Sequence, residues 1–328
     1  MTALATARVR REAAGARWGV ARTALRLHRA ALLVWALAVL GLTGWLVWLT
    51  EVTAGQARAE QEACDRAARD WCDTSLGTLG HSAPMDWIAA LTAHSFLVVA
   101  AFAGGGLIGR ELENGTARLA WSQSITPARW LAAKLTVPAL AVTLGVTVLV
   151  LVFRWAREPD RDLIGTDWTD GSVFVALGPA AVAYALCALA LGALSALLLR
   201  RALPALAVSV VLTWLLALVL GHFRAALWPA LTRTSATGEV HVPDTAWQVD
   251  RGALVHGSPA PDVNHWSCDG TAEETRRCLD DLGVTGSYAT YHPESHFWAL
   301  HLVETGILLA VTAAATVVSF RLLRRRTA

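Results

Sequence analysis

The chain has 328 residues, of which 55 % are hydrophobic and only 16 % are charged, and its formal net charge is +2 at neutral pH. Soluble globular domains carry about 25 % charged residues, so this composition excludes an ordinary soluble domain and favours an integral membrane protein. The small net charge says little by itself, but the distribution of the charges along the chain is informative.

Residues 1–29 are too polar to cross a membrane, but they are amphipathic when placed on one helix. This pattern predicts a cytoplasmic helix in the membrane interface, with its basic face toward anionic headgroups. A loose basic tail that only enforces the topology is the alternative. The basic arc consists of Arg8, Arg11, Arg22, Arg26 and Arg29, and the opposite face of Val9, Ala16, Val20 and Leu27.

Six stretches of the chain are apolar over about 20 residues, the length that crosses the hydrocarbon core of a bilayer. The first has no small-residue cleavage site after a short apolar core, so we interpret it as an uncleaved anchor. We predict an all-α integral membrane protein, with helices one to five in residues 30–223, helix six in residues 297–320 and a basic cytoplasmic tail at 321–328. The six predicted spans are 30–49, 87–108, 131–153, 173–199, 203–223 and 297–320.

Lys and Arg are concentrated on one predicted side of the membrane. The N-terminus, the segment 109–134, the turn at 200–201 and the tail carry seventeen Lys and Arg but only three acids, Glu12, Glu111 and Glu113. Because short cytoplasmic segments carry an excess of positive charge, we predict that both termini and the segment 109–134 are cytoplasmic.

The segment between the second and third spans, GRELENGTARLAWSQSITPARWLAAK at 109–134, has local structure signals. Three glycines at 104–106 let the second span end against a close neighbour. Asn114-Gly115 is a turn signal, residues 116–123 have the length of a two-turn helix, and Thr126-Pro127 is typical of a helix start. We therefore predict a turn and a short surface helix, within a loop at 109–131.

Leu119 and Trp121 are the apolar anchors of this short helix, and would seat it either in a groove of a partner or on the surface of its own bundle. Glu111 and Glu113 are expected to hold the lower end of the second span against cations, either Arg118 or arginines of the N-terminal helix. A short helix held between two spans can pass a push from the cytoplasm to both of them. The alternative is an ordinary polar loop that only satisfies the helix ends.

The outer side is predicted to consist of three loops, and the third, 224–296, is large enough to form an extracytoplasmic subdomain. Cys64 and Cys72 lie in the first outer loop, and Cys268 and Cys278 lie in the third. Since this is the side where thiols oxidise, we predict two local disulfides, Cys64–Cys72 and Cys268–Cys278. Free or metal-bound thiols are the alternative.

Polar residues inside the apolar spans are the remaining candidates for a site. Glu304 lies about a turn and a half into the last span, His301 is on the same helix face, and His94 lies in the second span. They either line a substrate route or form a hydrogen-bonded pair that closes the outer end of the bundle. His292 and His296 have a spacing that can bind a metal, but the proline after His292 places it before the helix, so we predict no metal site.

The string GRELENGTARLAWSQSITPARWLAAKL resembles the inner loop of type-2 ATP-binding-cassette (ABC) transporter permeases of actinobacteria. In that family an acid-rich end of the second span, a Gly-Thr pair and an Arg-Leu-Ala-Trp-x-Gln-Ser run precede the third span. The six-span layout, the amphipathic N-terminal helix and the large loop before the last span agree with it, whereas the length and cysteines of the third outer loop depart from it. The matching positions are Glu111, Glu113, Gly115, Thr116, Arg118, Trp121, Gln123 and Arg129.

The resemblance implies that this loop is a coupling helix docked on a separate ATPase subunit. The chain has no Gly-x-x-x-x-Gly-Lys-Ser/Thr loop around its one lysine, Lys134, so we expect no cofactor in this chain and ATP and Mg²⁺ on the partner. We expect a non-enzymatic permease subunit of an ATP-driven exporter in the cell membrane, working as a homo- or heterodimer, without catalytic residues or a nucleic-acid partner. The alternatives are a proton-coupled secondary transporter that uses Glu304 and His301, and a membrane hydrolase with a His-rich outer site.

Overall fold

The structure is a computed structural model that describes residues 28–67, 78–123, 125–163, 167–236, 240–260, 263, 268 and 270–327. It divides into two compact units. We name Met1–Val219 with Thr305–Ala328 the helical unit, and Leu220–Glu304 the sheet unit. The predicted amphipathic helix at residues 1–29 lies almost entirely outside the described residues.

Within the described residues, six helices are long and apolar enough to cross a membrane, which confirms the six predicted spans. Apolar side chains such as Leu33, Leu37 and Leu140 are more than 60 % exposed, as expected for a surface that contacts lipid tails. The six helices are Arg29–Ala67, Gly80–Glu113, Pro127–Arg157, Ala180–Leu199, Ala202–Leu227 and Glu294–Thr327.

The first helix is longer than its predicted span. It runs from α2 (Arg29–Trp48) through a π-helical turn, η1 (Leu49–Thr53), into α3 (Ala54–Ala67). The polar continuation stays helical because it consists mainly of Ala, Gln, Glu and Arg, which lose little side-chain freedom in a helix. The predicted first outer loop is therefore helical in its first part.

The second helix ends in an unusual π-helical stretch. It passes from η2 (Thr78–Ser82) through α5 (Ala83–Ala101) and η3 (Phe102–Gly109) into α6 (Arg110–Glu113). A Cβ atom added to Gly104 in η3 would lie 2.5 Å from Oγ of Ser209, in the fifth span. The glycine run thus permits the close approach that the sequence predicts.

The remaining spans follow with one departure from the prediction. A short helix, α7 (Thr116–Ser122), precedes α8 (Pro127–Arg157) and the 3₁₀ segment η4 (Glu158–Leu163). The predicted span 173–199 is instead two helices, because Gly178-Pro179 interrupts the backbone hydrogen bonding. These are α9 (Gly171–Ala176) and α10 (Ala180–Leu199), and α11 (Ala202–Phe223) follows after a two-residue turn.

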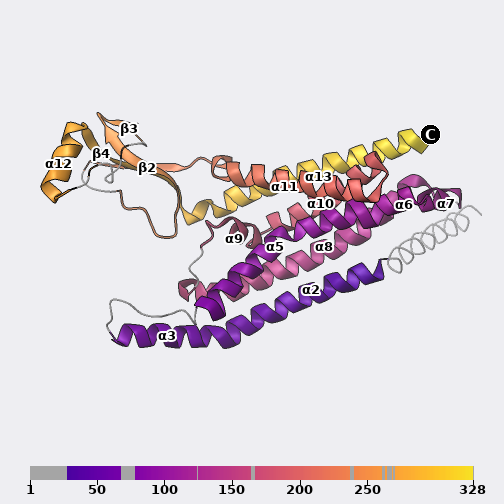
Figure 1. Cartoon of the computed structure of the whole chain (residues 1–328), viewed down its shortest axis with the longest axis horizontal. Coiled ribbons are helices and arrows are strands. Elements are labelled where there is room, and N and C mark those ends of the chain that lie inside the picture. Colours follow the sequence, from indigo (N-terminus) through magenta and orange to yellow (C-terminus); the bar gives the residue numbers. More distant parts are fainter. Residues whose placement is uncertain are drawn as a thin grey trace, which may run out of the picture. The chain divides into compact units, whose positions relative to one another are not determined.

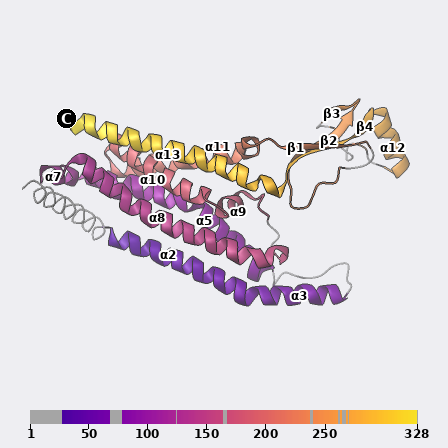
Figure 2. The same ribbon diagram turned by 180° about the vertical axis from the view of Figure 1, so that it is seen from behind.

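In the helical unit, α2 lies along α8, and α10 packs against both α5 and α8 (Figure 1 and Figure 2). Small residues permit the closest contacts: a Cβ atom on Gly192 of α10 would lie 2.6 Å from Cβ of Ala103 in η3. One apolar cluster joins α2, η1, α5, α8 and α9, and includes Leu46, Leu49, Ile88, Phe153 and Val173.

The sheet unit contains a four-stranded antiparallel sheet in the order β1-β4-β2-β3. Figure 2 labels its strands. The prediction of an all-α chain is therefore wrong in the third outer loop. The sequence of β4, VTGSYATYH, is rich in β-branched and aromatic residues that favour a strand, but a search for apolar spans does not detect it. The strands are β1 (Leu231–Ser235), β2 (Trp247–Val255), β3 (Ser258–Ala260) and β4 (Val284–His292).

A short helix and a disulfide complete the sheet unit. Helix α12 (Ala272–Asp281) begins with a capping box, in which Thr271 and Glu274 satisfy each other's backbone N–H groups. The bond between Cys268 and Cys278 joins this helix to the preceding loop and confirms the predicted pairing. The segments η5 (Arg224–Leu227) and η7 (Glu294–His296) also belong to the unit, and α13 (Phe297–Thr327) starts within it.

Candidate functional site

The polar segment between α6 and α8 turns at one left-handed residue. Gly115 has φ 73°, a conformation that favours glycine, and it reverses the chain between α6 and α7. Its carbonyl oxygen accepts hydrogen bonds from the backbone N–H groups of Arg118, at 3.0 Å, and Leu119, at 3.3 Å. The Thr116 hydroxyl donates to the carbonyl oxygen of Glu111 at 3.2 Å. The predicted turn and short helix are therefore both present.

The start of α8 also follows the sequence prediction. Oγ1 of Thr126 accepts a hydrogen bond from the backbone N–H of Arg129 at 3.4 Å, and Pro127 is the first residue of the helix. The side chains of Arg129 and of Gln123, at the end of α7, are exposed. These two residues are therefore accessible at the surface of the segment.

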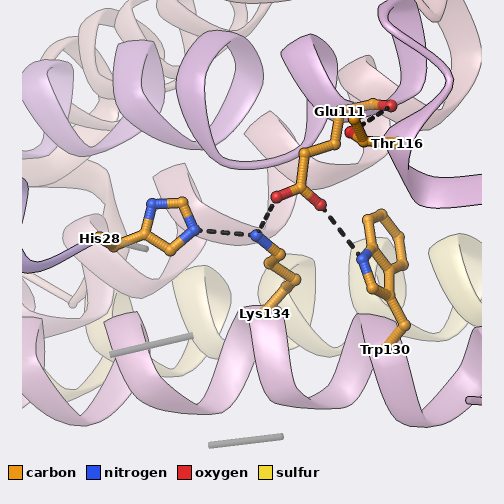
Figure 3. Close-up of polar contacts among 5 residues, drawn as sticks. All are labelled: His28, Glu111, Thr116, Trp130 and Lys134. Atoms are coloured by element: carbon orange, nitrogen blue, oxygen red, sulfur yellow. Dashed lines mark hydrogen bonds and ion pairs between the residues drawn. The ribbon is translucent and has the colours of Figure 1, made fainter. Parts of the chain in front are cut away.

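Glu111 bonds the segment to α8 (Figure 3). Its Oε1 accepts from Nζ of Lys134 at 2.5 Å, and its Oε2 accepts from Nε1 of Trp130 at 3.2 Å. Both donors lie on α8, one helical turn apart. The cation bound by Glu111 is thus Lys134 rather than Arg118, and the arginines of residues 1–27 lie outside the described residues.

Lys134 extends this network to the start of α2. Its Nζ donates to Nε2 of His28 at 2.9 Å, so His28 accepts as the neutral tautomer with its proton on Nδ1 (Figure 3). Burial lowers the pKa of His28, the Lys134 charge lowers it further, and the Glu111 charge opposes both effects. Since the side chain of Lys134 is only 7 % exposed, the charge depends on these two partners.

Glu113 bonds the same segment to a different helix. Its Oε2 accepts from the backbone N–H of Ala202 at 2.8 Å. Ala202 is the first residue of α11, where N–H groups have no partner within the helix and a negative charge is favourable. Glu111 and Glu113 therefore join one short segment to α8 and α11.

The two predicted apolar anchors of α7 have different environments. The Trp121 ring packs edge-to-face on Trp130 of α8, with the ring centroids 5.6 Å apart. The neighbouring Ala117 is buried, whereas Leu119 is 61 % exposed. Trp121 thus seats α7 on its own bundle, and Leu119 projects outward with Arg118 on the exposed face.

The acid of the last span has a partner that the sequence analysis missed. Glu304 accepts from Nε of Arg224 at 2.7 Å and from Nη2 at 3.0 Å, and both side chains are buried. Arg224 follows directly after α11 and is the first residue of η5. An arginine at the end of one apolar span, opposite an acid near the end of another, is the signal that identifies this pair.

The two histidines grouped with Glu304 lie in different units. His301 is fully buried in the sheet unit, and its ring stacks on Phe297 with the centroids 5.1 Å apart. In the helical unit, His94 donates from Nδ1 to the carbonyl oxygen of Ala90 at 2.8 Å. Its ring lies 5.7 Å from that of Trp214. Each histidine has its own aromatic neighbour.

The remaining cysteine and histidine candidates form small local contacts. Cys64 is disulfide-bonded, and Cys72, its predicted partner, lies outside the described residues. His292 is the last residue of β4, before the short η7, as its following proline predicts. Its Nδ1 lies 3.1 Å from Nδ1 of His296. Among the described residues, no three His, Cys, Asp or Glu side chains are arranged to hold a metal.

The chain has no significant match among curated proteins or among solved structures. Residues 29–224, more than half of the chain, match the family described as ABC-2 membrane transporter related. This range contains the helices from α2 to α11 and the polar segment with its two glutamates. The chain therefore belongs to this family, and it is a type-2 ABC transporter permease, a multi-pass membrane subunit that is not itself an enzyme.

Proposed function

We propose that this permease couples ATP hydrolysis by a separate ATPase subunit to export of a substrate, and that residues 110–123 are its coupling segment. The observation that carries the proposal is the double attachment of this segment, through Glu111 to α8 and through Glu113 to α11. The segment also continues directly from the second span through α6. A displacement of α7 would therefore reach three spans at once.

The exposed side of α7 is the proposed contact with the ATPase. Leu119 is an exposed apolar side chain on α7, and it is flanked by the exposed side chains of Arg118 and Ser122. An apolar anchor surrounded by polar groups is typical of a protein–protein contact. ATP and Mg²⁺ would bind to the partner, because Lys134 is the only lysine of the chain and is held by Glu111 and His28.

The proposal includes the orientation and the assembly. The excess of Arg and Lys at the termini, at the coupling segment and at the turn 200–201 favours a cytoplasmic position for all of them. A second permease copy, identical or related, would complete a translocation path between the two subunits, with one ATPase below each. The sheet unit would then be extracytoplasmic, where its disulfide is stable.

The coupling role is tested by one pair of variants in the assembled transporter. Glu113→Arg removes the acceptor for Ala202 N–H and places a positive charge at a helix N-terminus, so it should uncouple ATP hydrolysis from transport or release the ATPase. Glu62→Arg, on an exposed face of α3, is the matched charge reversal and should leave both activities unchanged. The readouts are ATPase retention on affinity-tagged permease, and ATP hydrolysed per substrate moved in proteoliposomes.

A position-specific cross-link tests the contact itself. Leu119→Cys should cross-link to the ATPase subunit, whereas Leu140→Cys, exposed on the apolar surface of α8, should not. Two results together would contradict the coupling role: variants across Glu111 to Trp121 that keep wild-type ATPase association and transport, and no cross-link from position 119. The segment would then be only a connecting loop.

The proton-coupled alternative has less support. A proton carrier has to exchange its partners during transport, but both carboxylate oxygens of Glu304 are bound by Arg224 in a buried, bidentate contact. For the hydrolase alternative, the described residues contain no group of three His, Cys, Asp or Glu side chains that could hold a metal at the His-rich edge.

A further inference from the structure

A pocket lies beside the coupling segment. It has a volume of about 240 Å³ and is enclosed by α6, α7, the end of α10 and the end of α13. All of these elements belong to the helical unit. Its lining includes Leu112, Arg118, Trp121, Arg200, Leu323 and Arg326.

The pocket concentrates positive charge without a counter-charge. Three exposed arginines, Arg118, Arg200 and Arg326, line it, and none of them is ion-paired with a carboxylate of the described residues. Nη1 of Arg326 donates to the carbonyl oxygen of Leu197 at 2.5 Å, which fixes this guanidinium at the end of α10. Three cations around one small cavity repel each other, and an anion between them removes this repulsion.

Trp121, one of the residues that line the pocket, carries a hydrogen-bond donor without an acceptor. Nε1 of Trp121 is buried and has no hydrogen-bond partner among the described residues. An indole N–H can only donate, and a buried donor that stays unpaired is destabilising. An oxyanion that reaches this N–H from the pocket would supply the missing acceptor.

The backbone conformation of Arg200 is a third observation, and it indicates that the arginine side chain has a role at this position. This residue caps α10 with φ 53°, in the left-handed region where helices most often place glycine. The chain has arginine there, although glycine would relieve the backbone strain.

We propose that this pocket binds a phosphate group, and that in the membrane the group belongs to the headgroup of an anionic phospholipid. Guanidinium groups bind phosphate in planar, bidentate contacts, and three of them with one N–H donor match an oxyanion of this kind. Leucine side chains line the rest of the cavity, as expected where a headgroup joins its acyl chains, and basic pockets between helix ends are typical lipid sites. The inference does not depend on the coupling role of α7.

The test uses the purified full-length chain in detergent, with thermal unfolding as the readout. Phosphatidylglycerol added as mixed micelles should raise the unfolding temperature by several degrees, and phosphatidylcholine should not. Inorganic phosphate and pyrophosphate form the second arm. A shift with phosphatidylglycerol alone identifies a lipid headgroup, and an equal shift with the free anions identifies a soluble phosphate compound as the source.

Three variants and a control separate binding from folding. Arg200→Gly should match or exceed the stability of the lipid-free wild type, because it relieves the left-handed arginine, while it weakens lipid binding at least 10-fold. Arg326→Gln and Trp121→Phe should weaken binding too, the latter by removal of the N–H alone. Arg325→Gln changes an exposed arginine that does not line the pocket, and should retain the full shift. Equal shifts in wild type and Arg200→Gly, or no shift with any of the probes, would overturn the proposal.

Discussion

Two buried ion pairs, one in each unit, hold a glutamate in different ways. In the sheet unit, both oxygens of Glu304 accept from the guanidinium of Arg224, and the carboxylate is fully buried. In the helical unit, Glu111 divides its oxygens between Lys134 and an indole, and 18 % of its side chain is exposed. The guanidinium fork permits one geometry, whereas an ammonium group is a point charge whose three donors rotate with a flexible chain.

The difference indicates two kinds of joint. The Arg224–Glu304 pair joins the residue after α11 to α13 in one fixed geometry, which suits a structural connection. The Glu111–Lys134 pair shares its cation with His28 and lies at the base of a short helix with an exposed face. A pair that can exchange partners suits a segment that moves, as the proposed coupling role requires.

Glu304→Gln should cause the largest loss of stability. The amide leaves the buried guanidinium of Arg224 without a counter-charge, and removal of one partner of a buried pair costs about 3–5 kcal/mol. We expect a lower unfolding temperature and unchanged transport per folded molecule, measured in proteoliposomes that contain the permease and its ATPase. Unchanged stability with altered transport would instead assign Glu304 to the substrate route.

A double variant and an exposed control variant test whether the unpaired charge causes this loss of stability. Arg224→Met with Glu304→Leu removes both charges and should recover most of the lost stability, since apolar replacement of a whole buried pair is often neutral. Glu273→Gln removes an exposed pair with Arg277, whose atoms are 3.2 Å apart, and should cost less than about 1 kcal/mol. Equal losses for Glu273→Gln and Glu304→Gln would contradict the contrast between buried and exposed pairs.

The sequence predicted the elements near these pairs better than the pairs themselves. Apolar runs located the six spans, and Asn114-Gly115 and Thr126-Pro127 located the short helix, because these signals are local. Hydropathy indicates how deep a residue lies along a span but not which way the helix is rotated. Hydropathy therefore does not reveal that Lys134 is buried against Glu111.

The partner of Glu304 required tertiary information. Arg224 and Glu304 are 80 residues apart, and a four-stranded sheet that was not predicted lies between them in the sequence. The hydrogen bond from the backbone N–H of Ala202 to Glu113 could not be predicted either, because every residue except proline has a backbone N–H and the residue types do not show which one is the donor. Local chemistry indicated which residues need partners, and the packing of the spans determined which partners they have.

Removal of the Cys268–Cys278 disulfide should loosen the sheet unit alone. The bond closes a loop with a sequence separation of 10, and closing a loop of this size stabilises by roughly 3 kcal/mol in the chain-entropy description. Cys268→Ser with Cys278→Ser should raise hydrogen exchange in α12 and leave exchange in α7 unchanged. Matching increases in both helices would show that the two regions do not respond independently.

Glu111→Gln should cost less stability but affect coupling more. Glu111 is 18 % exposed, whereas Glu304 is fully buried, so water offsets part of the lost charge and we expect a loss of only about 1–2 kcal/mol. Without the carboxylate the segment is held less firmly on α8, and more ATP should be hydrolysed for each substrate molecule moved. Glu62→Gln is the matched exposed control. A coupling ratio equal to that of the control would remove the functional distinction between the two pairs.

Acidification should lower the stability of both regions. Its effect should be smaller than those of Glu304→Gln, of disulfide removal and of Glu111→Gln. Burial lowers the pKa of His28 beside Lys134, and it is also the main cause that lowers the pKa of His292 in the sheet unit. A histidine with a lowered pKa binds more protons in the unfolded chain than in the folded one. Its contribution to stability is therefore complete above the ordinary pKa near 6.5, and it declines as the pH falls below 6.5 until the pH passes the folded-state pKa.

The two histidines should nevertheless act on different joints. A proton on Nε2 of His28 removes the acceptor for Lys134 and adds a second cation next to Glu111, so the coupling ratio should change between pH 7.5 and pH 5.5. Nε2 of His292 already donates to the carbonyl oxygen of Ala225, so an added proton goes to Nδ1, where it disturbs the contact with Nδ1 of His296 and leaves the Arg224–Glu304 pair intact. His28→Gln should therefore reduce the pH dependence of coupling, and His292→Gln should reduce only that of unfolding. If His292→Gln changed the pH dependence of coupling as much as His28→Gln did, the division into a fixed and a movable joint would be wrong.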